Sequence, residues 1–207
     1  MVTDEERFRD GDFVLLIPLF RTKKEIRFVI KLKSGQAFHS KFGVIQHDGI
    51  IGKYYGSVIS SHLNYNFIAL PAKLHEIVQN YKHFKFITQI IYPRDWATIC
   101  VFADIKKGDK IIEIGTGTGA FLSYLVRTVG SSGFVYSYEK DVERAKIAKR
   151  NLNELGIREG YIIKVRDVIK DGVDERNVDV VFIDLPEPWL VIKKAWCSLR
   201  PGGRIVV

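Results

Sequence analysis

The stretch KIIEIGTGTGA, residues 110–120, joins a short apolar run to three glycines at alternate positions. The run KIIEI predicts a buried β-strand, and Gly115, Gly117 and Gly119 predict a tight turn into a helix. Without side chains, such a turn lets a ligand approach the backbone, and the start of the following helix offers free N–H groups. This stretch predicts an α/β fold with a ligand site at the end of the strand.

The sequence around this turn alternates between helical and strand patterns. Helices are expected over 95–105, 119–129, 142–155 and 188–199, and strands over 110–114, 134–139, 160–166, 178–184 and 203–207. Asp95 is the expected N-cap of the first of these helices. Strands that are apolar nearly throughout, with helices between them, predict a doubly wound parallel sheet covered on both faces.

The N-terminal part of the chain has a different pattern. Residues 1–70 contain short strand-like runs with turn signals and predict a small β-rich domain. Residues 71–90 are expected to form a linking helix, beginning at Pro71, and a turn, before a second domain over 91–207. In the strand expected at 26–33, Arg27, Lys31 and Lys33 share one face, which is either a cationic binding surface or the solvated side of an edge strand.

Composition narrows the class of protein. The chain has 207 residues, a net charge of +8 and a pI of about 9.4, and cations are in greatest excess over residues 1–90, which favours a polyanionic partner. The polar start and the lack of a long apolar run predict a cytoplasmic protein without membrane segments. Cys100 and Cys197 are expected to be buried thiols. The spacing of the histidines at 39, 47 and 62 matches no zinc pattern, so no metal is expected.

Three acidic residues accompany the glycine turn. Glu113 precedes it, Glu139 ends the next strand, and Asp167 ends the strand after that. A carboxylate at the position of Glu139 can accept both hydroxyls of a ribose, and Asp167 can meet an adenine edge. Each acid could instead cap a helix. The three acids behind one glycine turn favour a nucleoside site, which fits S-adenosylmethionine and NAD equally well.

The fourth strand ends in DLPEPW, residues 184–189. Because this strand is expected beside 110–114, Asp184 would share the nucleoside crevice and could accept a hydrogen bond from an exocyclic amine. Two prolines fix the loop, and Trp189 could offer a stacking surface. The alternative is that Asp184 caps the next helix and Trp189 belongs to the core.

Four motifs in this order, EIGTGTG, YSYE, DLPEPW and RPGG, resemble those of class I S-adenosylmethionine-dependent methyltransferases, which have a Rossmann-like sheet. IIYPRD (90–95) and HDGIIGKYYGS (47–57) narrow the resemblance to the tRNA adenine-N1 methyltransferases that act on the T-loop adenine. The resemblance runs from about residue 10 to the end of the chain. It implies a tRNA substrate, a donor of methyl groups as cofactor, and a homo-oligomer, a tetramer in that family.

The resemblance also implies residue roles. Asp184 would contact the donor and bind the N6 amine of the target adenine, which makes N1 a better nucleophile, and Tyr92 would line the target-base pocket. Arg94, where the family usually has lysine, and Trp189 would contact the substrate. The basic N-terminal domain would hold tRNA phosphates through residues such as Arg27, Lys31 and Lys33. The donor would be held by Gly115, Thr116, Gly117, Thr118, Gly119, Ala120, Glu139 and Asp167.

The end of the chain departs from this family. GRIVV (203–207) is the expected fifth strand, and the antiparallel hairpin that normally follows it is missing. The chain is therefore either a fragment or covered at this edge by a partner. Two rival functions stay open: an NAD-dependent oxidoreductase, and a tRNA-binding subunit that keeps the methyltransferase fold without catalysis. The number of adenines modified is also open.

Overall fold

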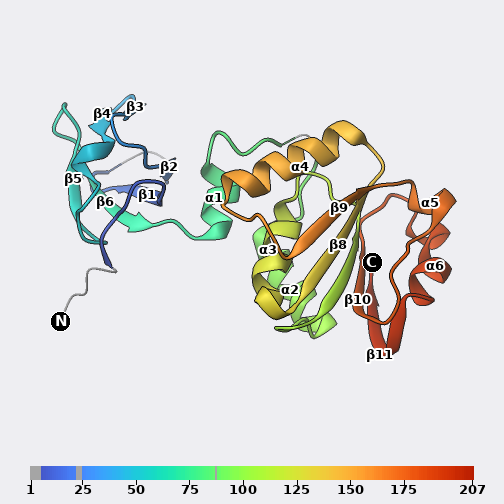
Figure 1. The fold of residues 1–207 in the computed structure, drawn as a ribbon. Helices are drawn as coiled ribbons and strands as arrows, with labels where there is room; N and C mark the ends of the chain where they lie inside the picture. Colours follow the sequence, from blue (N-terminus) through green and yellow to red (C-terminus); the bar gives the residue numbers. More distant parts are fainter. Residues whose placement is uncertain (1–5, 22–24, 87) are drawn as a thin grey trace. The chain divides into compact units, whose positions relative to one another are not determined.

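The computed structural model describes residues 6–21, 25–86 and 88–207, which form two compact units (Figure 1). The first unit ends at Phe84 and the second begins at Lys85. This boundary falls inside the segment 71–90 that the sequence pattern assigns to a link. The division into 1–70, 71–90 and 91–207 stays a prediction.

The N-terminal unit is β-rich, as predicted. Four antiparallel strands have the order β2-β1-β6-β5, and β3 and β4 form a separate hairpin. Their core contains a cluster of phenylalanine rings, among them Phe20, Phe42 and Phe67. The strands are β1 (Phe13–Pro18), β2 (Phe28–Lys31), β3 (Ala37–Ser40), β4 (Gly43–Gln46), β5 (Val58–Ser60) and β6 (Asn66–Pro71), with a short 3-10 helix at His47–Gly49.

Helix α1 (Leu74–Asn80) belongs to this unit and starts later than predicted. Pro71 is the last residue of β6, so it does not begin the helix. The N–H of Lys73 instead donates to the Glu76 side chain at 2.8 Å, which satisfies one of the free donors at this end. Directly after the helix, Tyr81 forms an isolated parallel β-bridge with Val29 of β2.

The C-terminal unit is the predicted parallel sheet, with strand order β11-β10-β7-β8-β9. In Figure 1, α2, α3 and α4 lie on one side of the sheet, and α5 and α6 lie on the other. The strands are β7 (Lys110–Ile114), β8 (Phe134–Glu139), β9 (Tyr161–Val165), β10 (Val178–Ile183) and β11 (Leu199–Val206). The helices are α2 (Pro93–Ala103), α3 (Ala120–Val129), α4 (Val142–Glu154), α5 (Val168–Asp171) and α6 (Ile192–Trp196), with 3-10 turns at Gly130–Ser132 and Pro188–Leu190.

The register of the sheet brings strand ends together. Ile114 is aligned with Tyr138 of β8 and with Ile183 of β10, so the residues after these strands meet at one edge. Ile112, Ile114 and Ile183 are fully or almost fully buried below that edge. The buried, paired strands therefore hold the loops that follow them in fixed positions.

Three local expectations in the C-terminal unit were wrong. Helix α2 begins at Pro93 with Tyr92 as N-cap, so Asp95 lies inside the first turn, because the fixed φ of proline suits the first helical position. The helix expected over 188–199 is a 3-10 turn followed by the short α6, and β11 begins already at Leu199, with a register shift against β10. Cys197 is exposed, whereas Cys100 is buried.

Neither a membrane-spanning helix nor a cluster of metal ligands is found among the described residues. Every helix there is too short or too polar to cross a membrane. No three histidine, cysteine, aspartate or glutamate side chains in this part of the chain are grouped as a metal site would be.

Candidate functional site

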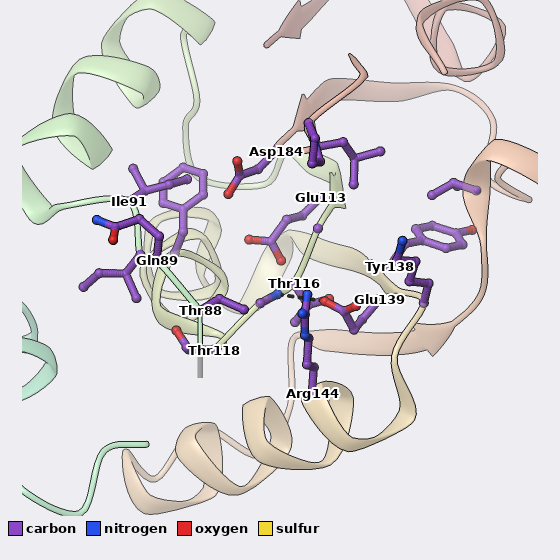
Figure 2. Close-up of a pocket in the computed structure, with 18 of the residues that line it drawn as sticks. Thr88, Gln89, Ile91, Glu113, Thr116, Thr118, Tyr138, Glu139, Arg144 and Asp184 are labelled. Carbon is purple, nitrogen blue, oxygen red and sulfur yellow. Dashed lines mark hydrogen bonds between the residues drawn. The ribbon is translucent and has the colours of Figure 1, made fainter. Parts of the chain in front are cut away.

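A cavity of about 440 Å³ opens where β7, β8 and β10 end in the C-terminal unit (Figure 2). The glycine loop, Glu139, Asp167 and Asp184 line it. Residues 88–91, directly before α2, form another wall. The sequence pattern predicted the strand-end part of this site but not the wall at 88–91, which has no periodic signal.

The glycine loop is shaped by close backbone approaches. At Gly115, with φ of 102°, a Cβ would lie 2.4 Å from the carbonyl oxygen of Asp184. The Asp184 N–H donates to the Ile114 carbonyl at 2.8 Å, so β7 and β10 converge at this point. A Cβ at Gly119 would lie 2.7 Å from Leu152 of α4. Gly119 therefore serves helix packing and is not part of the cavity lining, unlike Gly115, Thr116, Gly117, Thr118 and Ala120.

Glu139 is held in place by two backbone donors. Its Oε2 accepts from Gly117 N at 3.1 Å, and its Oε1 accepts from Asp141 N at 3.0 Å. Asp141, and not Glu139, caps α4 by accepting from Glu143 N and Arg144 N. The helix-cap interpretation of Glu139 is wrong, and the carboxylate is oriented toward the cavity instead.

Asp167 and Asp184 differ in their local roles. Asp167 does cap α5, because its side chain accepts from Ile169 N at 3.1 Å, and it also lines the cavity. Asp184 caps no helix: the N-cap of the following 3-10 turn is Glu187. Partial burial raises the pKa of the Asp184 carboxyl above its ordinary value.

Other predicted substrate residues lie outside the cavity lining. Tyr92 is 47% exposed at the start of α2, with Arg94 exposed in the first turn of that helix. Trp189 is 63% exposed, so the core interpretation of this residue is wrong. In the part of the chain that the structure describes, these three side chains form no wall of the cavity.

The predicted phosphate contacts Arg27, Lys31 and Lys33 belong to the N-terminal unit. Arg27 is engaged by Glu25 at 2.5 Å and lies 3.9 Å from Glu76. The Lys31 ammonium lies 5.1 Å from the Phe13 ring centre, and Lys33 is exposed. The strand expected over 26–33 is shorter in the structure, so Lys31 lies in β2 and Arg27 and Lys33 flank it. The three cations thus have different surroundings, which the alternating pattern did not indicate.

Glu113 is a buried acid inside strand β7, at 1% exposure, and its side chain reaches the cavity. The Ser137 hydroxyl donates to its Oε2, and the Thr116 hydroxyl oxygen lies 2.6 Å from that of Ser137. Burial raises the pKa of Glu113 to about 8, and the negative charges of Asp184 and Glu139 act in the same direction, while the Ser137 bond opposes them. Glu113 caps no helix, so that interpretation of it is also wrong.

Asn151 of α4 connects the glycine loop to Lys85, a contact that no sequence pattern indicated. Its Oδ1 accepts from Lys85 N at 3.0 Å, and its Nδ2 donates to Lys85 O at 3.0 Å and to Thr118 O at 2.9 Å. The side chain is fully buried. It therefore fixes Thr118 of the glycine loop relative to the backbone of Lys85.

Family comparisons agree with this architecture. Residues 78–207 match the family model described as tRNA methyltransferase complex GCD14 subunit, and residues 16–64 match a TR61B FKBP-like domain. A tRNA (adenine(58)-N(1))-methyltransferase catalytic subunit from Dictyostelium discoideum is 30% identical over 99% of this chain and 65% of its own length. The tRNA (adenine(57)-N(1)/adenine(58)-N(1))-methyltransferase TrmI of Methanocaldococcus jannaschii is 30% identical over 87% of this chain and 70% of its own.

Solved structures give the same result. A SAM-dependent O-methyltransferase from Thermotoga maritima has a TM-score of 0.85 and 38% identity, covering 97% of this chain and 72% of that one. The tRNA (m1A58) methyltransferase TrmI from Aquifex aeolicus has a TM-score of 0.78 and 30% identity, covering 96% and 74%. The predicted Rossmann-like methyltransferase fold is confirmed. The chain spans less than two thirds of the Dictyostelium relative, but its matched share is large enough to decide the family. This chain belongs to the family of the GCD14 subunit of the tRNA methyltransferase complex.

Proposed function

We propose that this chain transfers a methyl group from S-adenosylmethionine to N1 of the T-loop adenine of tRNA, position 58 in its relatives. One observation carries the proposal. Asp184, Glu139 and the glycine loop line a single cavity, so a carboxylate suited to an adenine amine adjoins a site suited to a nucleoside. The neighbouring adenine, position 57, is a second target in the name of the Methanocaldococcus relative. Mapping the methylated positions shows whether this chain also modifies it.

The residues of the cavity fit the donor. A carboxylate has about four lone-pair positions, so Glu139 can still accept both ribose hydroxyls after accepting from Gly117 and Asp141. Asp167 would meet the adenine of the donor with the capacity left after capping α5. Gly115 and Gly117 keep the loop free of side chains where the methionine end would approach.

When bound, S-adenosylmethionine supplies an electrophilic methyl group on a sulfonium. Asp184 would accept a hydrogen bond from the exocyclic amine of the target adenine, which raises electron density at N1 and stabilises the positive charge that N1 gains. The raised pKa of Asp184 makes it a stronger base for this task. Because N1 lies on the Watson–Crick edge, the base has to leave its stack first. Tyr92, Arg94 and Trp189 remain predicted contacts of that base.

The decisive experiment incubates the full chain with unmodified tRNA and isotopically labelled donor, then identifies the methylated nucleoside by mass spectrometry. We expect 1-methyladenosine from the T-loop. Asp184→Asn should retain binding of S-adenosylhomocysteine while transfer falls by roughly 10²-fold or more. Normal transfer by this variant would remove Asp184 from the mechanism.

The methylation experiment, together with a binding measurement, tests the rival functions. A methylated oxygen in the product would favour O-methyl transfer, the activity in the name of the Thermotoga structure. Binding of NADH in place of S-adenosylhomocysteine, measured by calorimetry, would favour an oxidoreductase. Donor binding without any transfer would favour the non-catalytic tRNA-binding subunit.

We further propose that the chain works as part of an assembly. The matched family is described as a complex, and the Dictyostelium relative as a catalytic subunit. A homotetramer and a cytoplasmic location, both expected from the sequence, stay predictions. Light scattering of the purified chain, combined with a methyl-transfer assay, tests the homotetramer. A monomer that gains activity only with a second protein would exclude a homo-oligomer as the active form.

A further inference from the structure

Glu113 is an acid in the cavity wall for which the proposed reaction has no task. It lies inside β7, aligned with Phe182 of β10 and with Ser137 of β8, so neighbouring strands fix its backbone on both sides. Its side chain is 1% exposed and cannot move into solvent without opening the sheet. A carboxyl group held in this way either pairs its negative charge with a positive charge inside the cavity or stays protonated and neutral.

The hydroxyl groups around Glu113 form a directed chain. Ser137 donates its hydrogen to Glu113 Oε2, so the hydrogen between Ser137 and Thr116 comes from Thr116. The chain therefore links the glycine loop to the carboxyl group and supplies it with one donor. One neutral donor compensates only part of the desolvation of a buried carboxylate.

The charges that face Glu113 are mostly negative. Asp184 approaches from the end of β10 and Glu139 from the end of β8, and Figure 2 shows Glu113 between them along the cavity wall. Within the described residues, no lysine, arginine or histidine forms an ion pair with Glu113. The wall at 88–91 and the start of α3 carry no charge. The remaining ionisable groups of the lining are Tyr138, Lys140, Arg144, Arg166, Asp167 and Glu187.

We propose that Glu113 makes the cavity selective for a cationic donor by exchanging a proton for the positive charge of the ligand. Without donor, the carboxyl group keeps its proton. When the sulfonium and ammonium of S-adenosylmethionine enter, the O–H bond of Glu113 breaks, the proton passes to solvent, and the carboxylate compensates the ligand charge. This inference rests on the proposed function, because it takes S-adenosylmethionine as the donor.

The size of the effect follows from the titration of Glu113. With a pKa of about 8, the group is roughly nine tenths protonated at pH 7 and more at pH 6.5. Release of nearly one proton at pH 6.5 requires the pKa in the complex to fall below about 5.5. By linkage, the ionised cavity then binds the donor more than about 10²-fold tighter than the protonated cavity does.

Calorimetry of the full chain in two buffers with different ionisation enthalpies counts the protons. At pH 6.5 the α-amino group of the ligand, with an ordinary pKa of about 7.7–8.0, stays charged and does not contribute. We expect S-adenosylmethionine to release close to one proton, and 5′-methylthioadenosine, an uncharged thioether nucleoside, to release almost none. Equal release by both ligands would overturn the proposal, since the ligand charge would then not be the cause.

Two variants locate the proton. Glu113→Gln should remove the release, whereas Glu143→Gln, at an exposed glutamate of α4, should retain it. If Glu113→Gln does not fold, infrared difference spectra of the unaltered chain decide instead, because donor binding should remove the band of a protonated carboxyl group. Donor binding without proton release, or with an unchanged carboxyl band, overturns this inference alone. Absence of donor binding overturns the proposed function as well.

Discussion

At Glu113 and Asp184 the same physical cause acts on two carboxyl groups, because both are partly or fully removed from water at the end of a parallel sheet. Desolvation disfavours the charged form, so the pKa of each is raised. Asp184 opens onto the cavity, where it can meet a substrate, whereas Glu113 lies in the strand itself. In the register of the sheet Glu113 is aligned with Phe182, so two residues along the strand-to-loop boundary separate the proposed catalytic acid Asp184 from the charge-sensing one.

The raised pKa of Glu113 predicts how stability changes with pH. Between about pH 4.5, where the unfolded chain ionises, and about pH 8, the folded state holds a proton that the unfolded state has lost. The free energy of unfolding should therefore decrease as the pH rises through this window, by an amount on the order of a few kcal/mol. Asp184 acts in the same direction, so urea unfolding at pH 5 and pH 8 should be compared with that of Glu113→Gln. A variant with the same pH slope as the unaltered chain would contradict the assignment.

Asn151 provides a second test at the scale of one side chain. Asn151→Ala removes three hydrogen bonds and leaves the N–H and carbonyl of Lys85 and the carbonyl of Thr118 without this partner. We expect a loss of about 2–4 kcal/mol in unfolding free energy, and a roughly tenfold or larger loss in affinity for S-adenosylhomocysteine because the glycine loop shifts.

The control for Asn151 is on the same helix. Asn153 is exposed, so Asn153→Ala should change neither stability nor affinity beyond about 0.5 kcal/mol. Calorimetry with S-adenosylhomocysteine and chemical unfolding measure both quantities. Equal effects of the two substitutions would show that helix propensity, and not the hydrogen bonds to Lys85 and Thr118, is responsible.

At the scale of elements, the site depends on how closely β7 and β10 converge. Gly115→Ala introduces a Cβ that would lie 2.4 Å from the Asp184 carbonyl, in addition to the cost of a positive φ. Gly156→Ala, at φ of 74° with open space around it, carries only the φ cost of about 1 kcal/mol. We expect Gly115→Ala to be destabilised by at least about 2 kcal/mol more than Gly156→Ala in thermal or urea unfolding. Equal costs would mean that the loop relaxes freely and that the convergence is not needed.

The strand pattern predicted most of this convergence. Five apolar strands separated by helices are sufficient to place Glu139, Asp167 and Asp184 at one edge, because parallel strands share the edge at which they end. The motifs could not indicate which acids also serve as caps. Asp141 follows Glu139 by two residues and is the N-cap of α4, whereas Asp167 is itself the N-cap of α5.

Other parts of the site depend on contacts that are distant in sequence. Asn151 and Lys85 are 66 residues apart, so no local pattern connects them. The wall at 88–91 has an irregular backbone without helical or strand period, so no periodic pattern could indicate it. The expected helix over 188–199 was wrong for a local reason instead. Val191, with φ of −116°, departs from helical geometry and separates the 3-10 turn at Pro188–Leu190 from α6.

At the scale of the whole molecule, the net charge of +8 matters for the proposed tRNA substrate. Phosphate contacts release counterions, so the logarithm of the affinity should fall linearly with the logarithm of the salt concentration. The slope is proportional to the number of phosphate contacts. A change in the slope after one cation is substituted therefore shows whether that cation contacts phosphate or is already paired with an acid of the protein.

The structure predicts an order among the cations that flank β2. Arg27 is engaged by Glu25 and lies near Glu76, so its charge is partly neutralised before any tRNA binds. Lys33 is exposed, and its substitution by alanine should weaken tRNA binding and reduce the salt slope by about one, the loss of one phosphate contact. Arg27→Ala removes the same charge but should change the slope by much less. Filter binding or fluorescence anisotropy over a series of salt concentrations measures both slopes. If Arg27→Ala lowers the slope as much as Lys33→Ala does, the tRNA displaces the acids from Arg27, and residues 26–33 act as the uniform cationic face that their alternating sequence indicates.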